Sequence, residues 1–345
     1  MNDKCMSIKD LIQEVFRHQD LWDYYSDDLF KIMDLEDSVK CKEFINRFFS
    51  VSGKAGCLVD IVEIDDLLKK HPERCQHIVY VFLLGIGIYN KNAKIKKLID
   101  EKVQLYSQKY KCESDVNFIF IWFLCCFFHD LGYIEENSLD LDWEFSYKDI
   151  GKCEGVPIMY RYKIKKYLEY RKKECQKVDH GIYAGVSMYK TLCAVRSKQE
   201  KECDNNTKLS WEENLIYIYN IASWIVLCHN IWITGNPDKY TEYGLQDLLD
   251  KPYPIKLNKS PLFFFFCLID SIEPIKNMKD FALLSDIDID IAEVGIKISS
   301  HNTNGLNEKY LNSINGIGDW LTIVHRDKNS VFINLNYGTS NYMLR

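Results

Sequence analysis

The segment FIFIWFLCCFFHDLGYIEE, from Phe118 to Glu136, constrains the fold more than any other part of the chain. An almost unbroken apolar run, which must be buried, leads directly into a histidine and an aspartate. Burying such ionisable groups without partners costs on the order of several kcal/mol, so the fold has to supply partners for them. A metal ion is one such partner, and it would need further ligands from elsewhere in the chain.

Apolar runs of helical length recur through the middle of the chain. They lie at 77–89, 116–129, 180–194, 213–229 and 261–272. From the first of these runs to the segment KPYPIKLNKSP, the only clear proline breaks are Pro157 and Pro237. The loop-like segments SKQEKECDNNTK and TGNPDKYTEYG join successive runs. The pattern predicts a bundle of buried helices, which we place at residues 71–274.

The two flanking segments have different patterns. Residues 1–70 contain IKDLIQEVF, KCKEFINRFF and IDDLLKK, whose apolar residues recur at helical spacing, interrupted by the loop-like SVSGKAG. Residues 275–345 contain DIDIDIAEVGIKIS, WLTIVH and VFINLNY, in which apolar and polar residues alternate as in strands. We therefore expect a mainly α protein, with a helical N-terminal layer and a small strand-containing (α+β) C-terminal appendage.

Composition favours a soluble, cytoplasmic protein. The chain has 345 residues, is 47% hydrophobic and carries a formal charge of −6, which gives a real core but no basic field for nucleic acid; a local basic groove stays open as an alternative. Its 13 cysteines form no C-x-x-C pair and are typical of reduced core residues. The N-terminus has no sustained apolar run, and the longest apolar runs fall short of the roughly 20 residues that a membrane span requires.

Ionisable residues stand at one position on each apolar helix, at or near its end. These positions are His77, His129 with Asp130, His180, His229 and Asp270. Helical spacing puts each on a buried stripe, as in the series Phe118, Trp122, Cys125 and His129. Inward-facing imidazole and carboxylate groups of this number suit one or two divalent metal ions.

The order His…His-Asp…His…His…Asp resembles that of the HD-domain superfamily of metal-dependent phosphohydrolases. FFHDLGY is its centre, DHGIYAG follows, and LCHNIW and LIDSIEP close it. The resemblance covers about Arg74 to Pro274, and the ordered set is far more specific than a single His-Asp pair. The GYP signature of the cyclic-di-GMP phosphodiesterases is absent, because Gly132 and Tyr133 follow the central motif without a proline.

The resemblance implies a ligand set. The ligands of a first metal would be His77, His129, Asp130 and Asp270, with Asp130 bridging to a second ion. His180 and His229 match the two additional histidines of family members that bind that second ion. The metals implied are iron, manganese, nickel or cobalt, with magnesium as a further candidate.

This ligand set predicts hydrolysis of a phosphate ester in a nucleotide or another small phosphorylated molecule by a metal-activated hydroxide. Asp130, His180 and Lys177 are the candidate catalytic residues, and the group that protonates the leaving group stays open. Tyr133, Glu135 and Asn230 also lie within a few positions of the ligands.

Several alternatives remain at this stage. The same ligands occur in HD-type di-iron oxygenases and in HD nucleases. A non-catalytic nucleotide-binding regulatory protein, in which the metal would only be structural, is a further alternative. His71 competes with His77 for the first ligand position. Asp179 either caps the helix that follows or holds the His180 ring. The segment KIKKYLEYRKKE is typical of a solvated helix face, with a nucleic-acid stripe as the alternative, and a homodimer through either flank is compatible with the pattern.

Overall fold

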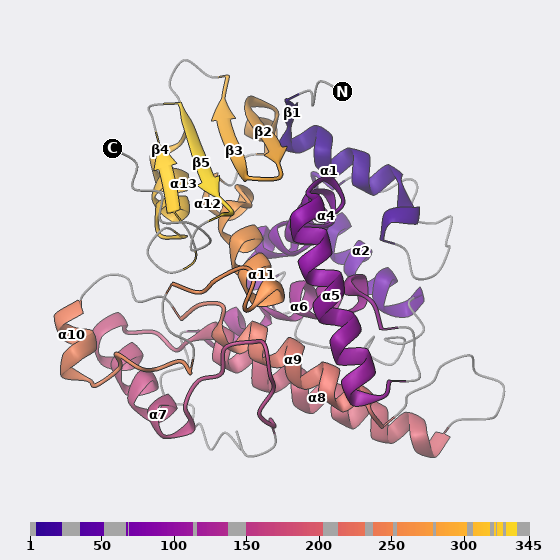
Figure 1. The fold of residues 1–345 in the computed structure, drawn as a ribbon, viewed down its shortest axis with the longest axis vertical. Helices are drawn as coiled ribbons and strands as arrows, with labels where there is room; N and C mark the ends of the chain where they lie inside the picture. The colour runs from indigo at the N-terminus through magenta and orange to yellow at the C-terminus, as the bar shows by residue number, and fades with distance from the viewer. Residues whose placement is uncertain are drawn as a thin grey trace.

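Helix α4 (Pro72–Lys91) is the central helix of the computed structural model (Figure 1). It packs against α1 (Ile8–Arg17), α2 (Ser38–Val51), α5 (Ala93–Tyr110), α6 (Phe118–Phe128), α11 (Pro261–Ile272) and α12 (Ile275–Met278). The structure describes residues 5–22, 35–51, 67, 69–112, 116–136, 150–202, 213–231, 237–250, 254–278, 281–301, 306–317, 321, 323–326 and 329–336. The middle of α4 is apolar on all sides, so neighbouring elements must cover every face of it. This explains why α4 lies at the centre of the protein.

The remaining helices complete the bundle. They are η1 (Gln19–Leu21), η4 (Leu131–Glu135), α7 (Arg161–Tyr170), the π-helical turn η5 (Arg171–Cys175), α8 (His180–Glu202), α9 (Leu215–Cys228), α10 (Pro237–Glu242), η6 (Phe281–Asp286) and α13 (Glu308–Asn315). Helices α8 and α9 form one pair, and α6 lies between this pair and α4. Each of the five predicted apolar runs is therefore a helix of the core, as expected.

Two close approaches set the direction of the helix pairs. A Cβ atom at Gly85 would collide with the Trp122 ring, and the Trp122 indole donates to the carbonyl of Phe82 at 3.0 Å. Helix α4 therefore runs against α6. A Cβ at Gly185 would lie 2.7 Å from the Ser223 carbonyl oxygen, which fixes α8 against α9 in the same way. Antiparallel pairing brings the start of one helix to the end of its partner, and the ligand-type residues lie at these ends.

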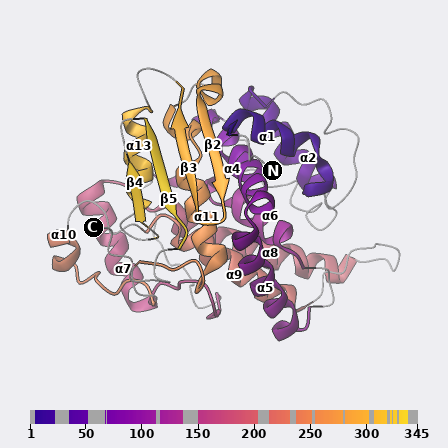
Figure 2. The ribbon, with the colours of Figure 1, turned by 45° about the horizontal axis from the view of Figure 1, so that its top comes forward.

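A five-stranded antiparallel sheet lies to one side of the bundle, beside α1 and α4 (Figures 1 and 2). Its order is β1-β2-β3-β5-β4, from β1 (Met6–Ser7), β2 (Ile287–Ala292), β3 (Gly295–Ser300), β4 (Ile323–Arg326) and β5 (Ser330–Asn334). Ile289 is paired with Ile298, and Ile296 with Ile333, so these buried isoleucines share the inner face. The predicted alternation and the mainly α class with a small strand-containing appendage are confirmed.

Some expectations about elements were incomplete or wrong. Helix α8 continues through Glu202 into the segment expected to be a loop, and α10 begins at Pro237 inside the second expected loop. Lysine, glutamine and glutamate favour helix without burial, and proline is well accommodated in a first helical turn. Helix α5 was not singled out, and neither was β1, which joins the N-terminal segment to the C-terminal sheet. The division at residues 70 and 274 stays a prediction, and most of SVSGKAG lies outside the described residues.

Burial separates the apolar helices from membrane spans. Among the described residues, one segment, Phe118–Glu135, is long and apolar enough to cross a membrane by composition, and 83% of it is buried inside the protein. Such burial is typical of the core of a soluble protein. The cysteines in the described part of the chain are free thiols, most of them buried or half-buried, in line with their expected role as reduced core residues.

Candidate metal centre

All six ligand-type residues predicted from the sequence meet at one end of the helical bundle. They are His77, His129, Asp130, His180, His229 and Asp270, and each is at most 6% exposed. His77 lies in the second turn of α4 and His180 begins α8, whereas His129 and His229 follow the last residues of α6 and α9. The antiparallel helix pairs therefore bring starts and ends together, and α11 adds Asp270 near its own end.

The donors fall into two groups of three. One atom from each of His77, His129 and Asp270 lies within 4.8 Å of the others, and the same holds for Asp130, His180 and His229. The four imidazole rings follow one another, with centroids 5.3 Å apart for His77 and His129, 5.4 Å for His129 and His229, and 5.2 Å for His229 and His180. Two adjacent sets of nitrogen and oxygen donors could each hold a metal ion.

Asp130 lies between the two groups. Its Oδ1 is 3.3 Å from Nε2 of His129 and 3.8 Å from Nε2 of His180. Its Oδ2 is 3.7 Å from Nε2 of His77. The two oxygens of one carboxylate thus face histidines of both groups, which is the position that a bridging ligand requires.

Hydrogen bonds orient the rings so that lone pairs face the centre. Nδ1 of His129 donates to the Cys126 carbonyl at 2.7 Å, and Nδ1 of His229 donates to the Val226 carbonyl at 2.5 Å. Nδ1 of His77 is 2.6 Å from Oε2 of Glu273. A proton fixed on Nδ1 leaves Nε2 as the metal-binding nitrogen, and such an outer partner is the usual companion of a histidine ligand. The donor set therefore fits a divalent transition metal.

Protons and charges in this network are unevenly distributed. Burial lowers the pKa of His129 to about 3 in spite of the nearby Asp130, so this ring stays neutral. Burial acts on His77 in the same direction, but its hydrogen bonds to Asp270 and Glu273 outweigh it and raise the pKa. A proton on Nε2 of His77 then donates to Asp270 at 3.0 Å and faces Nε2 of His129 at 3.3 Å. A divalent cation can replace that proton, since it satisfies all three groups at once.

Two basic side chains stand at the edge of the centre. Arg74, one turn before His77, donates to Oδ2 of Asp130 at 3.2 Å, and Lys276 donates to Oδ1 of Asp270 at 2.8 Å. Burial opposes ionisation of both carboxyl groups, but the surrounding histidines together with Arg74 or Lys276 outweigh it and hold each pKa below its ordinary value. Within the described residues, the Nε of Arg74 is buried without a hydrogen-bond partner. A cation with an unused donor beside the centre is suited to an anionic ligand.

Further residues hold His180. The Tyr133 ring stacks on His180 with a centroid distance of 3.9 Å, and a Cβ at Gly132 would collide with the His180 carbonyl oxygen, which explains the glycine. Oε1 of Glu136 lies 3.8 Å from Nδ1 of His180, and Lys177 donates to Oε2 of Glu136 at 2.8 Å. Partial burial opposes ionisation of Glu136, but His180 and Lys177 outweigh it and lower its pKa to about 2. Lys177 is therefore linked to His180 through Glu136.

The structure places the residues whose roles the sequence left open. Asp179 accepts from the Ile182 amide at 3.0 Å, so it caps α8, and it also accepts from Asn230 at 3.3 Å. The same Asn230 nitrogen lies 3.4 Å from Nδ1 of His180, so Asp179 reaches the ring only through Asn230. His71 precedes α4 and belongs to neither donor group. Glu135 was named near the centre, but its neighbour Glu136 faces His180.

Four residues of the centre were missed by the sequence reasoning, namely Arg74, Glu136, Glu273 and Lys276. A helical signal was present for Arg74, which is three residues before His77 on α4, whereas Glu273 follows the last residue of α11 with an extended backbone. No protein-family model, curated protein or solved structure matches the chain. The resemblance to the HD-domain superfamily therefore rests on the identity and order of the residues themselves.

Proposed function

We propose that the protein is a metal-dependent phosphohydrolase or phosphodiesterase of the HD type. Its substrate would be a nucleotide or another small phosphorylated molecule in the cytoplasm. The observation that carries the proposal is the pair of buried donor groups, three residues each, in which Asp130 of the second group also faces histidines of the first. An ordered set of imidazoles and carboxylates of this kind is the donor inventory of a dinuclear site.

The basic residues support an anionic substrate. When bound, divalent ions supply Lewis-acid chemistry, polarising a phosphoryl group and lowering the pKa of a water molecule. Asp130 would then coordinate metal through its carboxylate oxygens. The Arg74 guanidinium, released from Asp130, would be free to bind phosphoryl oxygens in a bidentate contact. Lys276 would keep Asp270 ionised and in place. The near-complete burial of the ligands excludes bulk water from around the reacting groups.

His180 has a role that depends on the number of ions. With two ions it would serve as a ligand, together with His229 and Asp130. With one ion it would be free to hold the proton for the leaving group, because Glu136 stands behind its Nδ1. In both cases Lys177 would act through Glu136, and we propose it as a positioning residue.

The test is the metal content of protein purified without chelators or a metal-affinity column, measured by inductively coupled plasma mass spectrometry beside hydrolysis of bis-p-nitrophenyl phosphate. We expect about two transition-metal ions per chain and metal-dependent hydrolysis. Asp130→Ala should lose both the metal and the activity. Asp247→Ala, which changes an exposed aspartate, should keep both.

Other results would lead to the alternative functions. Iron with dioxygen consumption but no hydrolysis would indicate an HD-type di-iron oxygenase. Tight, stoichiometric nucleotide binding without turnover would indicate a regulatory protein. Full metal occupancy in Asp130→Ala, or a wild-type protein that binds no metal, would show the proposed site to be wrong.

A further inference from the structure

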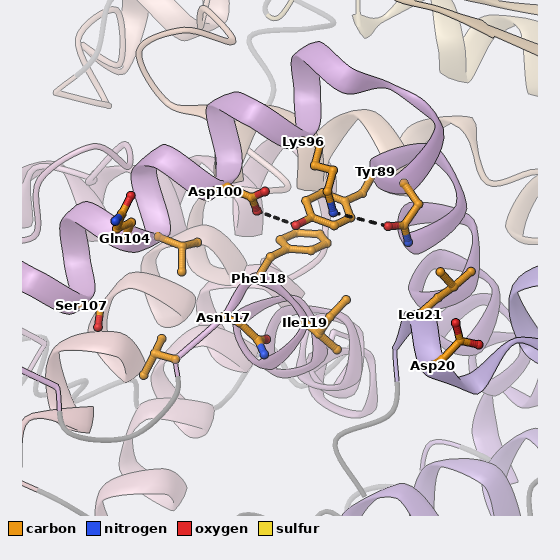
Figure 3. A pocket seen from close by; sticks show the side chains of 13 residues that line it. Asp20, Leu21, Tyr89, Lys96, Asp100, Gln104, Ser107, Asn117, Phe118 and Ile119 are labelled. Atoms are coloured by element: carbon orange, nitrogen blue, oxygen red, sulfur yellow. Dashed lines mark hydrogen bonds between the residues drawn. The ribbon is translucent and has the colours of Figure 1, made fainter. Parts of the chain in front are cut away.

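Among the pockets lined by described residues, two that lie outside the metal centre differ in their polar groups. The first, of about 480 Å³, lies between α4, α5 and the start of α6 (Figure 3). The Tyr89 hydroxyl donates to Asp100 at 2.5 Å, and the Lys96 ammonium lies 4.1 Å over the Tyr89 ring and 3.5 Å from the side-chain Oδ1 of Asn90 (Figure 3). Asp100 and Lys96 are thus already engaged by Tyr89 and Asn90, which leaves them less available to a ligand.

The second pocket, of about 420 Å³, lies at the N-terminal end of α11. Its lining is Lys102, Glu154, Gly155, Pro254, Ile255, Lys256, Lys259 and Ser260. Lys256 and Lys259 are exposed, and no carboxylate in the described part of the chain forms an ion pair with either. The acidic residue of the lining, Glu154, is 2.5 Å from Lys109. The pocket therefore carries an excess of positive charge.

Ser260 adds an unused hydroxyl to this pocket. It is the residue before α11 and only 1% exposed, yet its side chain makes no capping hydrogen bond. Among the described residues its hydroxyl has no hydrogen-bond partner, although a buried serine preceding a helix normally caps the helix amides. A ligand oxygen in the pocket would give this hydroxyl a hydrogen-bond partner.

The N-terminal end of α11 and the loop on the opposite wall also favour an anionic ligand in this pocket. The first amides of α11 point toward the pocket end of the helix, where the helix dipole is positive. On the opposite wall, Gly155 has a φ of +85°, and a Cβ there would collide with the side chain of Lys102. Glycine thus allows the Lys102 amine to lie against the loop and add a third cation to the pocket.

We propose that this pocket binds the phosphate groups of a small phosphorylated molecule. The exposed Lys256 and Lys259, a helix N-terminus and the Ser260 hydroxyl together match a multiply charged anion with several acceptor oxygens. The pocket is separate from the metal centre, because Pro261 and Asp270 are nine residues apart on α11, or about 13 Å along its axis. Binding here needs neither the metal nor the hydrolytic function.

The test is titration of inorganic pyrophosphate by isothermal calorimetry. The double variant Lys256→Gln/Lys259→Gln should bind at least about tenfold more weakly than wild type, since two charge-assisted hydrogen bonds are removed. Ser260→Ala should bind about fivefold more weakly. The matched control Lys165→Gln/Lys166→Gln changes two exposed lysines on α7 and should stay within about twofold of wild type.

Pyrophosphate can also bind metal, so the titrations are repeated in Asp130→Ala. Binding that persists there, and still depends on Lys256 and Lys259, supports a separate anion site whatever the fate of the hydrolase proposal. Equal weakening in both lysine pairs would show only a general effect of charge and would overturn the proposal. Binding that is lost in Asp130→Ala, or unchanged by the Lys256 and Lys259 changes, would overturn it as well.

Discussion

The polar groups at the two ends of helix α11 differ in whether they are bound to partners. At the C-terminal end, Asp270 and Glu273 are buried and bound to His77 and Lys276. At the N-terminal end, Lys256, Lys259 and the Ser260 hydroxyl have no such partners among the described residues. A closed buried network affects folding and metal affinity together, whereas an open set of cations affects only the ligand that it binds. The difference can be tested by substitutions at each end.

The largest effect is expected for Glu273→Ala. Glu273 is fully buried, accepts from His77 at 2.6 Å, and also accepts from the Ile275 amide at 2.7 Å. Removing one member of a buried charged pair costs about 3–5 kcal/mol, so the metal-free variant should unfold at markedly lower urea concentration. Glu135→Ala is the control, because that half-buried residue has no contact in the centre. A shift as small as that of the control would mean that the network does not support the fold.

The second effect concerns the number of ions. His180→Ala removes a donor from the group that contains Asp130 and His229 and leaves His77, His129 and Asp270 intact. We therefore expect the metal content to fall from about two ions per chain to about one, as measured by mass spectrometry. Asn230→Ala, which changes a neighbour of the ring and no ligand, should retain both ions. Complete loss of metal in His180→Ala would show that the two groups form a single site.

These predictions rest on parts of the molecule that the sequence revealed to different degrees. The five buried helices were readable because each is a continuous apolar run, and the six ligand-type residues because ionisable groups in such runs are costly. Helix α5 has its buried residues Ile95, Ile99 and Val103 at spacings of four, but charged residues separate them, so a search for apolar runs passes it by.

The partners of the ligands were harder to predict. Arg74 and Glu273 lie at helix ends, where charged residues are common, and their partners become clear only from the packing of α4 against α6 and α11. Strand β1 is a stronger case, since Met6 pairs with Ile289 from the far end of the chain. Two residues carry no alternation, and pairing across such a distance in sequence is decided by the tertiary fold.

A smaller effect is expected for Lys276→Gln. The Lys276 ammonium donates to Asp270 at 2.8 Å and repels any cation that Asp270 binds. Its removal should destabilise the metal-free protein by about 1–2 kcal/mol and raise metal affinity by about threefold or more, because both changes favour the metal-bound form. Urea unfolding of the metal-free protein and competition with a fluorescent chelator measure the two quantities. Weaker metal binding in this variant would contradict the idea that lysine and metal compete for Asp270.

The smallest effect is expected at the other end of α11. Lys256→Gln/Lys259→Gln changes two exposed side chains whose ammonium groups make no ion pair within the described residues, so the free energy of unfolding should change by less than about 0.5 kcal/mol. Metal content should also stay at the wild-type value, because the metal centre lies at the opposite end of the helix. Urea unfolding beside Glu273→Ala measures the contrast directly. A loss of more than about 1 kcal/mol would mean that these lysines already stabilise the fold through packing of their stems. The presence of these lysines would then be explained by stability and not by a ligand. Both ends of α11 would in that case serve to stabilise the fold.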